Sequence, residues 1–223
     1  MSGHFPALYF AAIVMAVAQE PRIEFATYFG GVEPDIGHSV AIGPGGDIWI
    51  AGVTHSTNFP VVSAYQSRCV LGPLQSCYDG FLARLSADGR TVRFSTYIGA
   101  STNDEITALA IDEQGYAYVT GRYKDGVLAA RFDPEGRPVY VLSFGGPLLT
   151  IGRALAIDDW GNLYLAGETS SPSFPAVNAI HPTVGPISCM AIGGGGIPID
   201  GVVMKLDPSG RVLFSTYLSG NGQ

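Results

Sequence analysis

Short apolar runs, rich in β-branched and aromatic residues, alternate along the chain with clusters of Gly, Asp and Pro. In the first part of the chain these runs cover residues 38–42, 48–53, 79–85 and 91–98. Runs of this length and composition, bounded by turn residues, are typical of β-strands. The pattern therefore predicts a unit of four short strands.

The unit is repeated along the chain. Residues 38–54 align without a gap with residues 107–123 and 153–169. Similar aromatic segments begin at Phe25, Phe94, Tyr140 and Phe214. An Asp-Gly pair opens the third strand of each unit, at Asp79, Asp125 and Asp200. Four antiparallel strands repeated as a unit form one blade of a β-propeller. The predicted fold class is therefore all-β, a propeller of four-stranded antiparallel blades with about three blades present.

The repeats set the expected domain boundaries within residues 22–223. We expect an outer strand at 22–29, blades at about 38–98, 107–144 and 153–218, and the start of a next repeat at 214–223. Closed propellers have about 4–8 blades, so three cannot close a ring. The strand at 22–29 would act as a clasp for the last blade of a ring. We therefore expect an open or truncated propeller that is completed by further blades or by self-association.

Tight turns join strands one and two and strands three and four of each unit, and most of them begin with Asp and end with Gly. Asp caps a type I turn through its side chain, and Gly supplies the positive φ that ends it. These Asp residues are therefore interpreted as turn residues rather than metal ligands, and the Asp/Asn and Glu spacing of an EF-hand is absent. No metal site is predicted.

Two of the connections between strands two and three carry long insertions that begin alike, Thr54-His-Ser-Thr-Asn-Phe-Pro60 and Thr169-Ser-Ser-Pro-Ser-Phe-Pro175. Together with the Tyr-x-Gly-Gly, Ala-Ile-Asp-x-x-Gly-Asn and Asp-Gly-Phe/Val elements, these segments resemble the SBBP β-propeller repeat family over residues 25–223. The resemblance implies an exported or cell-surface bacterial protein, often multidomain, without shared catalytic residues. The middle unit departs from the pattern because it lacks the Phe-Pro insertion.

Composition and charge narrow the function classes. Of 223 residues, 47% are hydrophobic and 14% charged, which excludes a disordered chain or a charged coiled coil. The net charge is −7 and there are two lysines, Lys124 and Lys205. Because phosphate contacts need clustered Lys and Arg, nucleic acid is not an expected partner.

The first 18 residues are interpreted as a signal peptide. An uncharged run at 5–18 ends in Ala16-Val17-Ala18, which fits an A-x-A cleavage pattern. The run is shorter than the roughly 20 residues of a membrane-spanning helix. A buried first strand or short helix is the alternative. The expected location is extracellular, periplasmic or at the cell surface, with no membrane span after processing.

The three cysteines fit an oxidising compartment. Cys69 and Cys77 lie in one Gly/Pro/Ser-rich stretch, where they can close a short disulfide loop; free thiols are the alternative. No C-x-x-C motif or histidine pair accompanies them, so zinc is not expected. Cys189 is left over.

The insertions share one face of the propeller with the links between blades, and loops on a rigid scaffold are where recognition usually occurs. Acidic pairs before the first strand of two units are candidates for an acidic ring at the channel mouth, with solvated loop charge as the alternative. The candidate ligand-binding residues on this face are Glu33, Asp35, His55, Asn58, Tyr65, Asp104, Glu105 and His181.

No nucleophile motif is present, and the four histidines lack partners at triad or ligand spacing. The stretch Gly193–Gly196 lacks the residues of a phosphate loop, and no cofactor is expected. The leading hypothesis is a non-enzymatic exported binding or scaffold module for an unknown protein or glycan. The alternatives are a fragment of a propeller enzyme, a lyase or glycan-active protein with its site at the channel mouth, and a stalk element of an adhesin.

Overall fold

The structure is a computed structural model that describes residues 22–100, 103–185 and 199–219. The predicted signal peptide at 1–18, Cys189, Gly193–Gly196 and the last four residues of the predicted next repeat lie outside the described residues.

Twelve strands form three antiparallel sheets in the described part of the chain. Blade 1 contains β1 (Asp35–Ile42), β2 (Ile48–Thr54), β3 (Asp79–Leu85) and β4 (Val92–Ile98). Blade 2 contains β5 (Glu105–Ile111), β6 (Ala117–Tyr123), β7 (Gly126–Phe132) and β8 (Pro138–Phe144). Blade 3 contains β9 (Thr150–Ile157), β10 (Leu163–Thr169), β11 (Asp200–Leu206) and β12 (Val212–Leu218). Each sheet keeps its strands in chain order, as in an up-and-down propeller blade.

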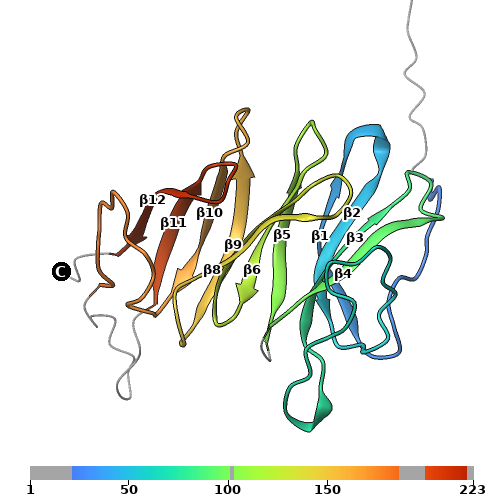
Figure 1. The fold of residues 1–223 in the computed structure, drawn as a ribbon, viewed down its shortest axis with the longest axis horizontal. Helices are drawn as coiled ribbons and strands as arrows, with labels where there is room; N and C mark the ends of the chain where they lie inside the picture. Colours follow the sequence, from blue (N-terminus) through green and yellow to red (C-terminus); the bar gives the residue numbers. More distant parts are fainter. Residues whose placement is uncertain (1–21, 101–102, 186–198, 220–223) are drawn as a thin grey trace, which may run out of the picture.

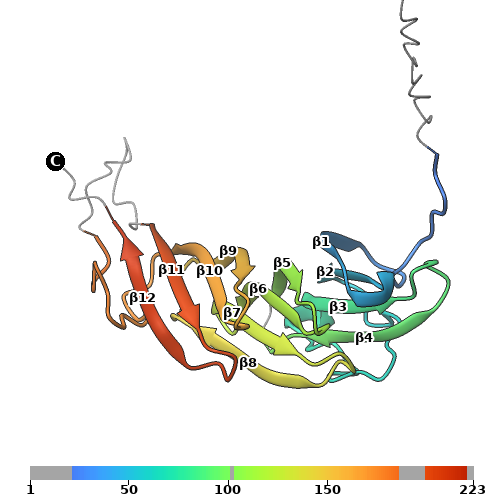
Figure 2. The ribbon, with the colours of Figure 1, turned by 90° about the horizontal axis from the view of Figure 1, so that it is seen from above.

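The three blades stand side by side in an open row, with blade 2 in the middle (Figure 1). Seen from above, β1, β5 and β9 line one side of the row and β4, β8 and β12 the other (Figure 2). The predicted fold class is therefore confirmed: an almost all-β propeller arrangement with three blades, not closed into a ring. Helical structure in the described residues is limited to 3₁₀ turns at Pro44–Gly46 and Pro73–Gln75, and none of it is long and apolar enough to cross a membrane.

Apolar side chains fill the spaces between blades. Trp49, Leu82 and Phe94 of blade 1 pack with Leu109 and Val119 of blade 2 in one buried cluster. A second cluster joins blade 2 to blade 3 in the same way. The middle strands are covered on both faces, which explains why β3 and β7 are apolar at nearly every position instead of alternating.

A repeated glycine in the second strand of each blade follows from a β-bulge in the pairing with the first strand. At Gly52 an added Cβ would overlap the carbonyl oxygen of Ile36, and at Gly121 it would overlap that of Glu105. Gly167 faces the Ile151 carbonyl in the same way. Only glycine fits this approach of two backbones.

The bounds of two kinds of element differ from those expected. The first strands begin at Asp35, Glu105 and Thr150, two or three residues earlier than predicted, because pairing with the second strand continues across the bulge. Residues 22–29, predicted as an outer strand, are not in a strand. The other strands of the blade that they would complete are not among the described residues, so their backbone groups have no ladder to join.

Candidate functional site

The two ends of the blades differ. The tight hairpins β1–β2, β5–β6 and β9–β10 lie at the top in Figure 1, and the long connection between β2 and β3 extends from the bottom. We call the first end the turn face. The other end, formed by the β2–β3 and β10–β11 insertions and the links between blades, is the loop face.

The insertion of blade 1 is fixed by buried side chains. The Ser56 amide donates to Thr54 Oγ1 at 3.0 Å. Phe59 is buried in an apolar cluster of blade 1 that is separate from the cluster between blades 1 and 2. The Tyr97 hydroxyl donates to Ser56 O at 2.7 Å and accepts the Phe59 amide at 2.9 Å. The Thr-x-Ser-x-x-Phe-Pro signature is thus an anchor for the loop.

Blade 3 repeats this anchor. The Ser171 amide donates to Thr169 Oγ1 at 3.0 Å, Phe174 is buried, and the Tyr217 hydroxyl donates to Ser171 O at 3.0 Å. In both blades the inserted chain then runs along the outermost strand. Val62 pairs with Ser95 of β4, and Val177 pairs with Ser215 of β12.

Two residues that follow in the insertions have equivalent places. The Gln66 amide donates to Thr96 Oγ1 at 2.8 Å, and the His181 amide donates to Thr216 Oγ1 at 2.9 Å. The candidate His181 is therefore held through its backbone, with a half-buried side chain. Blade 2 has no insertion, and its outer strand reads Tyr-Val-Leu-Ser at 140–143 where the other two read Phe-Ser-Thr-Tyr.

The structure brings Glu33, Asp35 and Asn58 together around Ser56. Asp35 Oδ2 accepts the Gly31 amide at 2.6 Å and the Ser56 hydroxyl at 3.1 Å. Asn58 Oδ1 accepts the Val32 amide at 3.1 Å, and the Glu33 amide donates to Ser56 Oγ at 2.9 Å. Only the Glu33 side chain projects from this cluster into solvent without a structural bond among the described residues.

Asp104 has the equivalent place in blade 2. It is buried, and its carboxylate accepts the Ala100 amide at 2.6 Å and the Lys124 amide at 2.9 Å. Its neighbour Glu105 is half-buried at the start of β5. Asp35 and Asp104 thus organise the links between blades, while Glu33 and Glu105 are the more accessible members of the two acidic pairs.

The remaining candidates are aromatic. The half-buried His55 ring meets the Tyr78 ring edge-on at 4.6 Å between centroids. Tyr65 is 47% exposed and its ring lies 6.1 Å from that of the buried Phe132 in blade 2. These side chains present an imidazole and a phenol on a loop that is held at both ends.

Cys69 and Cys77 are joined by a disulfide, with their Cα atoms 5.9 Å apart. Beside it lies Asp79, a fully buried carboxylate that the sequence showed only as part of a repeated Asp-Gly pair. Asp79 Oδ2 accepts the Val70 amide at 2.9 Å and Gln66 Nε2 at 3.1 Å. Burial, with a smaller contribution from the charge of Asp104, raises the pKa of Asp79 to about 6.

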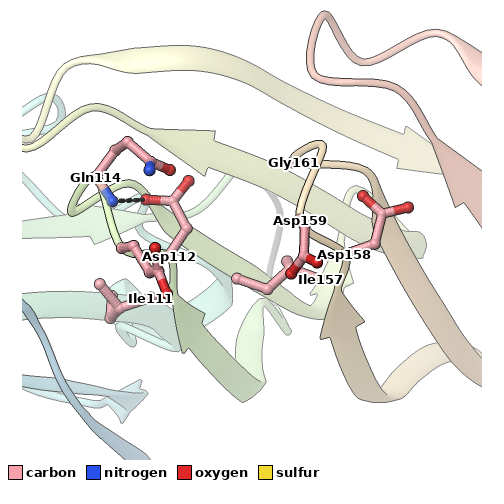
Figure 3. Close-up of a pocket in the computed structure, with 8 residues that line it drawn as sticks. Ile111, Asp112, Gln114, Ile157, Asp158, Asp159 and Gly161 are labelled. Atoms are coloured by element: carbon pink, nitrogen blue, oxygen red, sulfur yellow. Dashed lines mark hydrogen bonds between the residues drawn. The ribbon is translucent and has the colours of Figure 1, made fainter.

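A hollow of about 460 Å³ opens on the turn face between blades 2 and 3 (Figure 3). Asp112, Glu113, Asp158 and Asp159 line it, together with Ile111 and Ile157. The carboxylates of Asp112 and Asp158 are bound within their own turns, as the turn interpretation expects. Asp112 Oδ1 accepts the Gln114 and Tyr116 amides, and Asp158 Oδ1 accepts the Trp160 and Asn162 amides.

The pKa of Asp158 reflects these contacts. Partial desolvation would raise it, but hydrogen bonds from Asn162, Tyr164 and Trp160 lower it to about 2. The carboxylate therefore stays ionised and hydrogen-bonded within its own turn. Glu113 and Asp159 are the exposed members of the hollow, and Trp160 beside them is 80% exposed.

A set of cations that sequence reasoning missed connects the blades near the turn face. Arg84 donates to Pro134 O of blade 2 at 2.5 Å, and Arg131 donates to Pro208 O of blade 3 at 3.0 Å. Each also pairs with a turn carboxylate of its own blade, Asp47 and Asp112 respectively. The sequence does contain a sign of these cations, because the third strand of each blade has a basic residue directly before its last Leu or Phe.

Among residues 22–100, 103–185 and 199–219, no group of three or more His, Cys, Asp and Glu side chains could hold a metal ion. The site chemistry of the loop face is instead a rim of carboxylate, imidazole, amide and phenol groups on anchored loops. That composition suits contacts with a protein or a glycan.

A family model described as the SBBP β-propeller repeat matches residues 93–122. A comparison with curated proteins gave no significant match. The matched residues run from β4 of blade 1 through the link into β5 and β6 of blade 2. This stretch contains the outer strand, the glycine of the bulge and the turn Asp described above. At residues 93–122 the chain therefore contains an SBBP β-propeller repeat, in agreement with the resemblance seen in the sequence.

Proposed function

We propose that this β-propeller scaffold is a non-enzymatic binding module of an exported or cell-surface protein, and that a protein or glycan ligand contacts its loop face. The observation that carries this proposal is the construction of the insertions. Their signature residues are buried and bonded to the outer strand, so the residues between them are presented from a rigid support. Rigid loops that expose side chains are suited to recognition because little conformational entropy is lost on binding.

The turn face is a poorer candidate for the ligand site. Its Asp112 and Asp158 carboxylates accept turn amides and pair with Arg131 and Lys205. A ligand would have to compete with these bonds. The disulfide between Cys69 and Cys77 supports the exported location, since disulfides persist in oxidising compartments.

A glycan array and an array of short unstructured peptides, probed with the full chain in oxidised form, test the proposal. We expect retention by one class of probe. A loop-face variant, His55→Ala with Tyr65→Ala, should weaken that binding at least about tenfold, the effect of losing one or two aromatic contacts. The matched turn-face variant, Glu113→Gln with Asp159→Asn, should bind like the parent chain.

Loss of binding only in the turn-face variant would move the ligand to the hollow of Figure 3 and contradict the proposal. A chemical change in a bound glycan would favour the enzyme alternative. Mass spectrometry of the recovered glycan distinguishes simple binding from turnover.

A further inference from the structure

The outermost strands of blades 1 and 3 are paired along their outer edges. In blade 1 the Val62 amide donates to Ser95 O of β4 at 3.0 Å, and the Ser95 amide donates to Val62 O at 2.9 Å. In blade 3 the same two bonds join Val177 and Ser215 of β12, at 3.1 and 2.8 Å. Two of the three outer edges are therefore closed by a segment that runs antiparallel to the strand.

The third outer strand, β8 of blade 2, has the same register but an open edge. Val141 lies opposite Ala130 of β7, as Ser95 lies opposite Ala83 of β3. The N–H and C=O of Val141 therefore point away from the sheet, as those of Ser95 do. Within residues 22–100, 103–185 and 199–219, neither group has a hydrogen-bond partner.

The exposure of the outer strands reflects this difference. Ser95 and Ser215 are fully buried next to the insertions. Val141, at the equivalent position, is only half-buried, Ser143 is exposed, and Val139 is 45% exposed. Blade 2 is thus one chain segment narrower than its two neighbours in the described part of the molecule.

The open edge of β8 lacks the features that usually prevent pairing. Edge strands of native proteins are protected by a charge, by a proline within the strand or by a covering segment. Residues 139–144 read Val-Tyr-Val-Leu-Ser-Phe, without a charge or a proline. An uncharged edge of this composition pairs readily with another extended chain.

The two insertions show what kind of chain fits such an edge. Each places a valine opposite the outer strand, and the next residue turns the chain with a positive φ, 49° at Ser63 and 50° at Asn178. The covering segments are single chains that belong to no other sheet. One short extended segment, centred on a β-branched residue, is therefore enough to close the edge.

The side chains of β8 favour an apolar covering chain. In blade 1 the hydroxyls of Ser95 and Thr96 bond the backbone of the insertion. β8 has Val141 and Leu142 at these positions and offers no hydroxyl there. Val141 instead packs against the apolar cluster between blades 1 and 2. A β-branched side chain opposite Val141 extends this cluster, because cross-strand pairs of that kind are favourable.

We propose that the outer edge of β8 binds an extended segment of another protein by strand addition, with a β-branched residue of that segment opposite Val141. The added segment runs antiparallel to β8 and pairs with the outward backbone groups of Val141 and Ser143. The insertion of blade 1 pairs with those of Ser95 and Tyr97 in the same way. This edge lies on the side of the row formed by β4, β8 and β12 (Figure 2), and the proposal does not depend on the loop-face ligand.

Backbone amide exchange, measured by NMR on the full chain in oxidised form, tests the proposal residue by residue. Without a partner, the Val141 amide should exchange at least about tenfold faster than the Ser95 and Ser215 amides, because only those two are hydrogen-bonded. The probe is a peptide of residues 60–66, the segment that closes the edge of β4. At about twice its Kd, the peptide should slow exchange at Val141 and Ser143 about threefold.

Two matched changes isolate the backbone pairing. A probe that carries an N-methyl group on the valine of position 62 cannot donate to Val141 O and should give no protection. In the chain, Val141→Pro removes the outward N–H and leaves the ladder to β7 intact, a substitution that edge strands tolerate, and it should abolish binding. Val141→Thr keeps the backbone groups and the branched side chain and should bind like the parent.

The proposal is overturned if the Val141 amide of the free chain is as protected as that of Ser95, because the chain itself would then cover the edge. Protection that grows with protein concentration would replace the proposed partner by a second copy. The proposal also fails if the probe gives no protection up to its solubility limit, or if the N-methylated probe protects equally well. These two results hold even if Val141→Pro does not fold.

Discussion

Asp79 illustrates how one buried side chain organises a loop. Its carboxylate is fully buried, yet it accepts hydrogen bonds from the Val70 amide and the Gln66 side chain, so it holds the disulfide loop and the middle of the insertion to β3. Oδ1 has no hydrogen-bond partner among the described residues. Burying a charge that is only partly satisfied is costly, and the raised pKa expresses that cost.

Replacement of this carboxylate by an amide should therefore stabilise the protein at neutral pH. The pKa rises from 3.8 in the unfolded chain to about 6 in the fold, so the fold binds the proton more tightly. The stabilisation that the fold gains from binding this proton more tightly is fully present below about pH 4 and is lost as the pH rises through 6. The difference between the two pKa values corresponds to about 3 kcal/mol of unfolding free energy.

Urea unfolding of the parent and of Asp79→Asn between pH 4 and 8 checks this. The free energy of unfolding of the variant minus that of the parent should increase with pH and level off above about pH 7. Asp88→Asn, at an exposed turn, is the control and should show no such rise. A pH-independent difference for Asp79→Asn would contradict the expectation.

At the scale of the element, each outer strand is matched to the loop that runs beside it. In β4 and β12 the Ser-Thr-Tyr triplet bonds the insertion of the same blade, and β8 lacks both the triplet and the loop. The insertion therefore acts as a fifth, irregular strand that covers an exposed sheet edge. The match explains how residues 55–66 and 170–181 are held along the outer strands of their blades.

Removal of the Tyr97 hydroxyl should loosen the first insertion. Tyr97→Phe leaves the buried Phe59 amide and Ser56 carbonyl with only their long mutual hydrogen bond of 3.4 Å, which costs about 1–3 kcal/mol. Hydrogen exchange at residues 56–66 should become faster, while β6 and β7 keep their protection. Tyr65→Phe, at an exposed ring, should leave both unchanged. Equal exchange in the parent and Tyr97→Phe would show that the hydroxyl does not fix the loop.

The sequence predicted the strands well because the strand signals are local. Apolar runs bounded by Asp-Gly turns specify β1–β12 within a few residues, and the repeats specify the sheet order. The path of residues 61–66 along β4 could not be predicted, because it depends on hydroxyls of Ser95, Thr96 and Tyr97 that are distant in the sequence. For the same reason Asp35 and Asp104 were candidates for a ligand site, although their partners are amides of the adjacent links.

At the scale of the molecule, neighbouring blades are joined by more than apolar packing. Arg84 and Arg131 each pair with a carboxylate in their own blade and donate to a carbonyl in the next. The Arg131 guanidinium also lies 3.9 Å from the centre of the Tyr116 ring. Because such a cation bonds two blades at once, it fixes their relative orientation, which apolar contacts alone define poorly.

Arg131→Met should weaken the junction of blades 2 and 3. The substitution removes a charged hydrogen bond to Pro208 O and leaves Asp112 without its cation, a loss of about 2 kcal/mol. Thermal unfolding followed by circular dichroism should show a lower midpoint. Arg137→Met removes two exposed ion pairs in the same blade, with Asp133 and Glu135, and should leave the midpoint unchanged. If both substitutions lowered the midpoint equally, the cause would be the loss of a positive charge and not a weakened junction between blades 2 and 3.

The family match at 93–122 begins in one blade and ends in the next, so the unit of sequence is offset from the unit of structure. The contact of Phe94 on Gly136 joins two blades in space but lies within one sequence repeat, counted from Phe94 to the residue before the next aromatic segment at Tyr140. Duplication of a gene segment that encodes one such repeat therefore copies an interface between blades together with four strands. An array can grow by one blade in this way with its new junction already encoded, and no neighbour is left short of a strand.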